Sequence, residues 1–332
     1  MKKLITAIML MMLCALLTAG GTPAEDKLPP LGRDITIWFD TGGPVGGPYN
    51  TIVQNGATQA AADMGCDIKL LYSDWNPEKM IENFKTALSA RPNGIVAMGH
   101  PGDGAYAPFI QEAIDAGIQV TCVDTDLPQS REKYKSKGFG SIGTNPDVMG
   151  TTLAREALVR SGLKKGNRAF IWGLKRLEER GRRARAMIRT LEGAGLIVDY
   201  IEISPEVDKD TSMGAPIIAG YLASHPDCGM MLIDHGALTS QMGNFLKSAG
   251  VKPDDIFVGG FSLSPATATA IEDGYVDLVS EMQPYLLGYL SVAQIVLTQK
   301  YGFTGLEIDT GGGLVHKANI GLVAPLAQKG IR

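Results

Sequence analysis

Short apolar runs alternate with longer amphipathic stretches from residue 35 almost to the end of the chain. The apolar runs are rich in β-branched and aromatic residues, which favour buried strands, whereas the amphipathic stretches repeat their apolar positions at helical spacing. The predicted strands are 35–39, 68–72, 94–98, 119–123, 139–142, 169–172, 198–203, 229–233, 256–260, 276–281 and 306–309. The predicted helices are 51–64, 77–90, 105–116, 147–161, 178–194, 212–224, 237–249, 265–273 and 284–298. A polar, glycine-rich tail follows.

The alternation falls into two successive sets of βα units, each about the size of one domain. Strands that alternate with helices are typical of parallel sheets covered by helices on both faces. The pattern therefore predicts an α/β protein with two doubly wound domains rather than one barrel. Ligands of such sheets bind beyond the carboxyl ends of the strands, so a site is expected in the loops that follow them.

The loop at 40–49, between the first predicted strand and the first predicted helix, contains four glycines and two prolines. Neither a helix nor a central strand tolerates this composition, so the chain must turn here. Gly42 and Gly47 have the glycine spacing of a P-loop, but Pro48 stands where that motif needs lysine, and no Gly-x-Gly-x-x-Gly fingerprint is present. We therefore expect a ligand other than a nucleotide, with a phosphate ligand or a plain connecting loop as the alternatives.

The first residues of the chain carry the pattern of an export signal. Two lysines precede an apolar run at 4–17, and the small residues up to Ala24 fit a cleavage site, which predicts a removable signal peptide at 1–24. The apolar run is shorter than the roughly 20 residues that span a bilayer, and no later stretch approaches that length. We therefore expect a soluble mature protein in the periplasm.

Charge and cysteine content narrow the possible partners. The formal net charge is −4, and loss of the two lysines of the leader makes the chain more acidic. An acidic chain without basic tracts is not expected to bind nucleic acid or anionic membrane surfaces. Cys66, Cys122 and Cys228 form no Cys-x-x-Cys pair and lie within or beside apolar strands, which favours buried free thiols, with one disulfide as the alternative.

Six short motifs give the chain a family resemblance through their order and spacing. They are Pro48-Tyr49-Asn50, Gly56-Ala57, Asp124, Glu179-Arg180-Gly181, Gly259-Gly260-Phe261 and Gln283-Pro284-Tyr285. Placed after a signal peptide, they resemble the ribose-binding type of periplasmic sugar-binding proteins, the solute receptors of sugar ABC importers, over nearly all of the mature chain. The resemblance implies two Rossmann-like lobes, the type I periplasmic binding protein fold, with a sugar held between them.

The resemblance also implies how the chain is divided between the lobes. Three crossings, which act as hinges, are expected near 143–145, 282–284 and 309–311, so that the last predicted helix returns to the first lobe. The expected parts are a signal peptide at 1–24, an N-terminal lobe at 25–143 and 284–309, and a C-terminal lobe at 144–283 and 310–332. The implied protein is a monomer that delivers a sugar or polyol to a membrane permease, with no cofactor, no metal and no catalytic residue.

Five positions of the first lobe match ligand contacts of that family. Tyr49 matches an aromatic that packs against the sugar ring. Asn50 matches a second contact, or else it caps the following helix. His100 matches a polar contact, with an ordinary loop histidine as the alternative. Asp124 is the strongest candidate because a carboxylate can accept from two hydroxyls. Thr125 stands where the family often has arginine, which argues against the usual recognition of a pyranose.

Four positions of the second lobe match further contacts. Arg180 can donate to two oxygens at once, although its neighbouring arginines make a solvated basic helix face the alternative. Asp234 replaces a common asparagine, Ser262 a carboxylate and Met282 a glutamine. Because acceptors have moved and one amide is lost, the ligand is expected to differ from ribose in its hydroxyl pattern. A polyol, a deoxy sugar or a branched sugar fits as well as a pentose.

Motifs of enzymes are incomplete in this chain. The run 260–264 begins like a nucleophile elbow, but Ser264 stands in place of the closing glycine. The run 208–212 begins like a calcium loop, but Met213 occupies the glycine position. The four histidines show no His-x-x-x-His pair. We therefore expect a binding protein rather than an enzyme; the alternatives are a periplasmic sugar-modifying enzyme and a sugar or quorum-signal receptor of a sensory pathway.

Overall fold

The computed structural model describes residues 29–178 and 180–332. The predicted signal peptide at 1–24 lies outside the described residues. The chain from Leu31 to Arg332 forms one compact unit that holds all the helices and strands described below. None of the helices in this part of the chain is both long enough and apolar enough to cross a membrane.

The first lobe is built on a six-stranded sheet in which all neighbouring strands are parallel. The strand order is β11-β5-β4-β3-β1-β2. The strands are β1 (Thr36–Asp40), β2 (Asp67–Leu71), β3 (Gly94–Met98), β4 (Gln119–Thr125), β5 (Gly140–Thr144) and β11 (Glu307–Asp309). The five amino-terminal strands are those that the apolar runs predict, and β11 joins the sheet from far along the chain.

The second lobe repeats this plan with one exception at its edge. Its strand order is β12-β10-β9-β8-β6-β7, and only the β10–β12 pair is antiparallel. The strands are β6 (Arg168–Gly173), β7 (Ile197–Glu202), β8 (Cys228–Ile233), β9 (Phe257–Phe261), β10 (Leu278–Glu281) and β12 (Gly313–His316). The predicted α/β class with two doubly wound lobes is confirmed.

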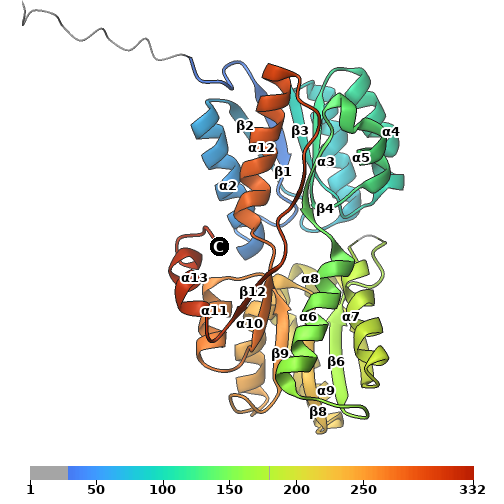
Figure 1. The fold of residues 1–332 in the computed structure, drawn as a ribbon, viewed down its shortest axis with the longest axis vertical. Coiled ribbons are helices and arrows are strands. Elements are labelled where there is room, and N and C mark those ends of the chain that lie inside the picture. The colour runs from blue at the N-terminus through green and yellow to red at the C-terminus, as the bar shows by residue number, and fades with distance from the viewer. Residues whose placement is uncertain (1–28, 179) are drawn as a thin grey trace, which may run out of the picture. The chain divides into compact units, whose positions relative to one another are not determined.

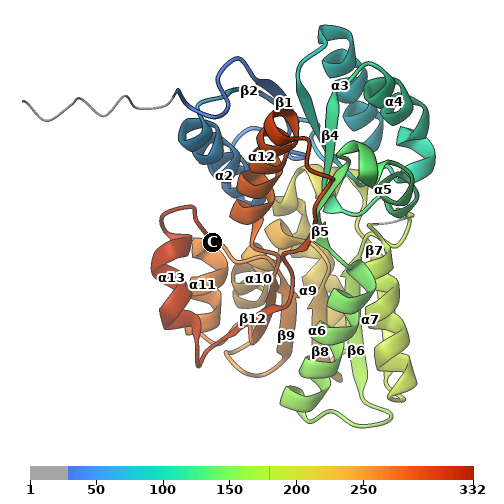
Figure 2. The same cartoon turned by 45° about the horizontal axis from the view of Figure 1, so that its top comes forward.

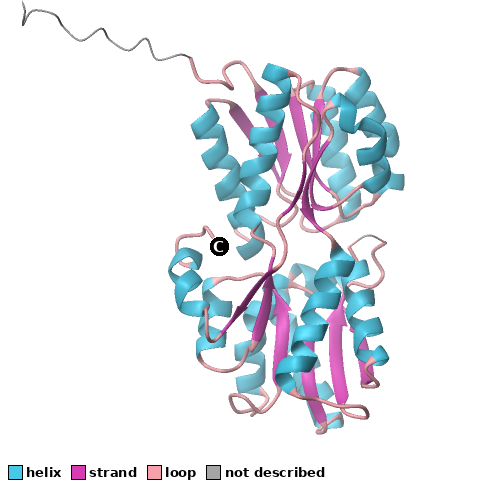
Figure 3. Ribbon diagram, in the orientation of Figure 1, coloured by secondary structure: helices cyan, strands magenta, loops and turns pink. Residues whose placement is uncertain are grey.

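Helices cover both faces of each sheet (Figures 1 and 3). Those of the first lobe are α2 (Pro48–Met64), α3 (Pro77–Ala90), α4 (Asp103–Asp115), α5 (Pro128–Tyr134) and α12 (Pro284–Tyr301). Those of the second lobe are α6 (Pro146–Ser161), α7 (Arg182–Gly193), α8 (Pro205–Lys209), α9 (Ala215–Ser224), α10 (Gly236–Ser248), α11 (Pro265–Glu272) and α13 (Ile320–Ala327). Two 3₁₀ turns lie at Lys135–Lys137 and Thr211–Gly214.

Helix α12 packs closely against α2, as the predicted return of the last long helix to the first lobe requires. Two glycines allow the close approach. A Cβ added at Gly56 would lie 2.0 Å from the carbonyl oxygen of Tyr285, and one added at Gly288 would lie 1.9 Å from that of Val53. Apolar side chains of α12, including Leu287, then join the first-lobe core.

The chain passes between the lobes at three places, which can be followed in Figures 1 and 2. These crossings join β5 to α6, β10 to α12, and β11 to β12. Buried Thr310 ties all three together. Its N–H donates to the carbonyl oxygen of Gly143 over 2.8 Å, its hydroxyl donates to that of Met282 over 2.8 Å, and its own carbonyl oxygen accepts from Gln283 Nε2 over 2.8 Å.

The structure corrects several predictions. Helix α2 begins at Pro48 behind Gly47, so Asn50 does not cap it. Short helices such as α5 and α8, which are too brief to show an apolar period, were not predicted. The tail contains β12 and α13 rather than only loop. The three cysteines among the described residues are unpaired; two are buried, and Cys66 is half-buried.

Candidate functional site

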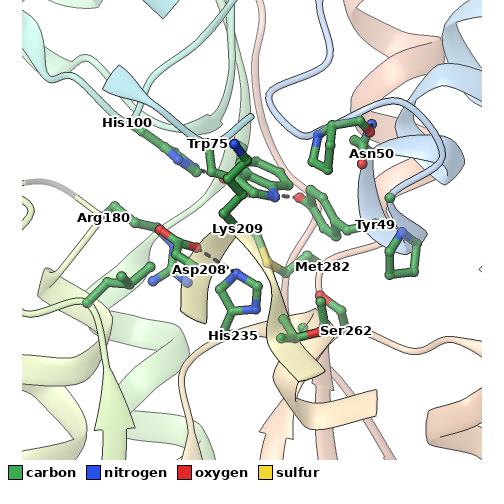
Figure 4. Close-up of a pocket in the computed structure, with 18 of the residues that line it drawn as sticks. Tyr49, Asn50, Trp75, His100, Arg180, Asp208, Lys209, His235, Ser262 and Met282 are labelled. Atoms are coloured by element: carbon green, nitrogen blue, oxygen red, sulfur yellow. Dashed lines mark hydrogen bonds and ion pairs between the residues drawn. The ribbon is translucent and has the colours of Figure 1, made fainter. Parts of the chain in front are cut away.

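A cavity of about 140 Å³ lies between the carboxyl ends of the strands of the two lobes (Figure 4). The first lobe contributes side chains from the loop after β1, from the start of α2, from the loops after β2 and β3 and from the end of β4. The second lobe contributes side chains from α8, from the segment that precedes α7, and from the loops after β8, β9 and β10. The site is therefore where parallel α/β sheets are expected to bind ligands.

Aromatic rings form the wall of the cavity that belongs to the first lobe. The Trp75 ring stacks on His100, with ring centres 5.6 Å apart and planes 20° apart, and Tyr49 is tilted against Trp75 at 5.8 Å. Gly42 is required beside this wall, because its φ is +84° and an added Cβ would lie 2.6 Å from the Trp75 ring. The first glycine of the loop thus makes room for the tryptophan.

Buried Asp40 holds the loop that carries Trp75. Its Oδ1 accepts from the N–H of Gly42 over 2.8 Å and from Ser73 Oγ over 3.0 Å, and its Oδ2 accepts from Asn83 Nδ2 over 3.0 Å. Burial raises the pKa of Asp40, and these donors oppose the rise. The N–H of Trp75 in turn donates to the carbonyl oxygen of Gly42 over 2.9 Å. The aromatic wall is therefore held in place before any ligand arrives.

Asp124 is the second-last residue of β4, lies at the floor of this wall and is already hydrogen-bonded. Tyr49 donates its hydroxyl to Oδ1 over 2.8 Å, and His100 Nε2 makes a short hydrogen bond to Oδ2. Burial would raise the pKa of Asp124, but His100, and then Arg180 and Arg183, outweigh it and lower that pKa to about 2. The φ of Asp124 is +69°, a strained backbone for any residue but glycine, asparagine or aspartate.

Two arginines of the second lobe are fixed by one buried carboxylate. Asp234 is fully buried and accepts from Arg180 Nη1 over 2.9 and 3.0 Å and from Arg183 Nε. Arg183 also lies over the Phe261 ring, 3.8 Å from its centre. Burial, and then the neighbouring Arg180, lower the pKa of Arg183 although Asp234 opposes them. Asp234 thus orients the two guanidinium groups from below the cavity.

A histidine and a carboxylate of the second lobe also meet at the cavity. His235 Nε2 lies 3.0 Å from Asp208 Oδ1, and Figure 4 shows both side chains at the cavity. His235 Nδ1 accepts from the N–H of Leu238 over 3.3 Å at the start of α10. That bond leaves the proton on Nε2, so the ring presents an N–H to Asp208.

Seven of the nine predicted site residues line the cavity. They are Tyr49, Asn50, His100, Asp124, Arg180, Ser262 and Met282. Thr125 and Asp234 do not line it: Thr125 follows Asp124 in the strand and lies beside a smaller pocket, and Asp234 is covered by its arginines. Asn50 donates to the carbonyl oxygen of Pro44 over 2.7 Å, so its amide braces the glycine-rich loop.

The residues that line the cavity but that sequence reasoning missed include Trp75, Arg183, Asp208 and His235. His235 directly follows Asp234 after a strand, a position where a site residue is expected. The run of arginines that contains Arg183 suggests a solvated basic helix face, but Arg183 is buried. Among residues 29–178 and 180–332, no cluster of histidine, cysteine, aspartate and glutamate is arranged to hold a metal ion.

Two α/β lobes with a polar, aromatic-walled cavity between the carboxyl ends of their strands define a two-lobed solute receptor. The chain belongs to the periplasmic binding protein family, because the profile of the periplasmic binding protein domain matches residues 42–300. The resemblance seen in the sequence is thereby confirmed.

Individual relatives and solved structures agree with this assignment. A xylose/arabinose-binding protein of Sulfolobus acidocaldarius is 29% identical over 290 residues, covering 82% of this chain and 69% of the relative. The ribose import binding protein of Escherichia coli is 23% identical, covering 87% of this chain and 89% of the relative. A carbohydrate transporter from Acidothermus cellulolyticus, solved with myo-inositol, has a TM-score of 0.77 at 22% identity, covering 90% of this chain and 99% of that one.

Proposed function

We propose that the protein is a periplasmic receptor that captures a sugar or sugar alcohol between its lobes and delivers it, as a monomer, to the permease of an ABC importer. The observation that carries the proposal is the composition of the cavity: aromatic rings of one lobe face buried, charged hydrogen-bonding groups of the other. A sugar matches both, since its C–H face packs on aromatic rings and its hydroxyls bond to carboxylates and guanidinium groups. Two of the relatives named above are a xylose/arabinose-binding protein and a ribose import binding protein.

The size of the cavity limits the ligand. A cavity of about 150 Å³ accepts one benzene molecule, a single six-membered ring. The cavity here, at about 140 Å³, is of the same size. The expected ligand is therefore one pentose, hexose or cyclic polyol rather than an oligosaccharide.

The division of the chain follows from the same proposal. The N-terminal lobe comprises 25–143 and 284–309, the C-terminal lobe comprises 144–283 and 310–332, and the three crossings act as hinges. A ligand that contacts both lobes favours the closed arrangement, because only that arrangement completes its contacts. Small-angle scattering with and without a saturating ligand tests this, and an unchanged radius of gyration at confirmed occupancy contradicts it.

A thermal-shift screen of the mature chain tests the function directly. The panel contains D-xylose, L-arabinose, D-ribose and myo-inositol, with ATP and NAD as nucleotide controls. A sugar at a hundred times its Kd should stabilise the folded protein by about 2.7 kcal/mol, which raises its melting temperature. Mass spectrometry of the released ligand should show an unchanged mass. A shift with the nucleotides alone, or conversion of the sugar into a new product, refutes the proposal.

A further inference from the structure

Asp208 is a buried carboxylate of the second lobe that faces the cavity. It lies near the end of the short helix α8, where Val207 anchors the helix in the second-lobe core. The Asp208 side chain is 9% exposed, and it lines the cavity beside His235. No sequence motif points to it, because the run that contains it resembles only the start of a calcium loop.

The neighbours of Asp208 keep it charged, but only one of its two oxygens has a close donor. Burial would raise its pKa, but His235, Arg180 and Arg176 outweigh burial and lower that pKa below its ordinary value. His235 Nε2 lies 3.0 Å from Oδ1 as an ion pair, and this oxygen has no other partner among the described residues. On the other oxygen, Arg176 Nη2 is at 3.5 Å.

Asp124 differs from Asp208 in this respect. Its Oδ1 already accepts from Tyr49, and its Oδ2 already has the short hydrogen bond to His100. Oδ2 of Asp208 has only the long contact to Arg176, so a ligand group that donates to it contributes more than one that adds to an oxygen with a short hydrogen bond. Of the two carboxylates at the cavity, Asp208 is the one with unused acceptor capacity. Ser262, by contrast, offers only a hydroxyl on the same lobe.

We propose, on the basis of the function proposed above, that Asp208 is the acceptor of the second lobe that determines which ligand hydroxyl is required. His235 acts as a positioning residue for it, since its ring is held by the N–H of Leu238 and presents Nε2–H to the carboxylate. The ligand class is a single-ring sugar or cyclic polyol with a free hydroxyl at the end that faces α8. A compound that lacks this hydroxyl leaves Oδ2 of Asp208 without a close donor in the closed cavity.

The test compares Asp208→Asn with the wild type by calorimetric titration. The ligands are whichever of D-xylose, L-arabinose, D-ribose and myo-inositol binds best, together with its set of single-deoxy analogues. Glu206→Gln is the matched control, because Glu206 lies on the same short helix but is exposed and outside the cavity. Melting of the unliganded proteins verifies that each variant folds, and Asp208→Ser provides a second variant of smaller volume.

We expect Asp208→Asn to weaken binding of the parent compound by roughly tenfold or more and Glu206→Gln to leave it unchanged. One deoxy analogue should bind the wild type as weakly as the parent compound binds Asp208→Asn. For that analogue, the affinities of the wild type and of Asp208→Asn should differ by less than about threefold, because the loss of the hydroxyl and the substitution remove the same interaction. Unchanged affinity in folded Asp208→Asn, or an equal further loss with every analogue, overturns the inference. A wild type that binds none of the panel overturns the proposed function and this inference with it.

Discussion

The hydrogen bonds to Asp124 predict how the stability of the unliganded protein depends on pH. The pKa of this carboxyl is about 2 in the folded protein, against an ordinary value of 3.8. Because the folded-state pKa is depressed, the stabilisation is complete above the ordinary pKa and is lost as the pH falls through the folded-state value. The window is therefore about pH 4 to pH 2.

The size of the effect follows from the difference between these two pKa values. Each unit of difference corresponds to about 1.4 kcal/mol, so Asp124 contributes about 2 kcal/mol to the free energy of unfolding at neutral pH. Asp124→Asn removes the charge but keeps the shape of the side chain, and asparagine tolerates the positive φ of this position. The free energy of unfolding of the variant should be about 2 kcal/mol lower at pH 7, although the side-chain oxygen of the asparagine can still accept from the Tyr49 hydroxyl.

Urea unfolding of both proteins at a series of pH values from 7 to 2.5 measures the prediction. The gap between them should be constant from pH 7 to about pH 5 and should narrow steadily below pH 4. Asp67→Asn, at an exposed position of edge strand β2, is the control and should show little gap at any pH. If the gap for Asp124→Asn stays the same down to pH 2.5, the carboxylate is not stabilised by its neighbours and the reasoning is refuted.

Three further substitutions test other features of the structure. Thr310→Val removes the hydroxyl that bridges two crossings and should lower the free energy of unfolding by about 1–2 kcal/mol in urea titrations, while Thr86→Val on an exposed helix surface should cost less. Gly288→Ala should lower the free energy of unfolding by about 1–3 kcal/mol or more, since α12 must move off α2; an unchanged free energy of unfolding contradicts the close packing. Trp75→Ala should weaken sugar binding by tenfold or more in calorimetry, and undiminished affinity excludes the ring as a ligand contact.

The regular parts of the fold could be predicted because each element carries its own signal. Helix α3 was predicted with its observed bounds, since the Asn76 side chain accepts from the N–H of Lys79 and Pro77 takes the first helical position. Strand β3 was likewise predicted to the residue, because a fully buried parallel strand is a continuous apolar run. The placement of Asp124 at the cavity followed from its position at a strand end.

The remainder depends on contacts between distant segments. Strand β12 is a short edge strand of four residues, too few to form an apolar run that the sequence would reveal. Its place in the sheet depends on antiparallel pairing with β10. Arg183 belongs to the cavity because α7 begins only at Arg182 and turns that side chain inward toward Asp234, which a run of arginines does not reveal. Asp208 lies on a helix too short to show a period, and its partner His235 is supplied by another loop.

The three crossings of the chain also determine the order in which the molecule can fold. The first-lobe core includes Leu287 and Val292 of α12, and the second-lobe sheet is completed by β12. A nascent chain that ends before residue 284 therefore has neither core finished, and the face of α2 around Val53 remains uncovered. Domains usually fold one after another as the chain emerges. Here both lobes must wait for the last part of the chain, so they reach their native packing together rather than in sequence.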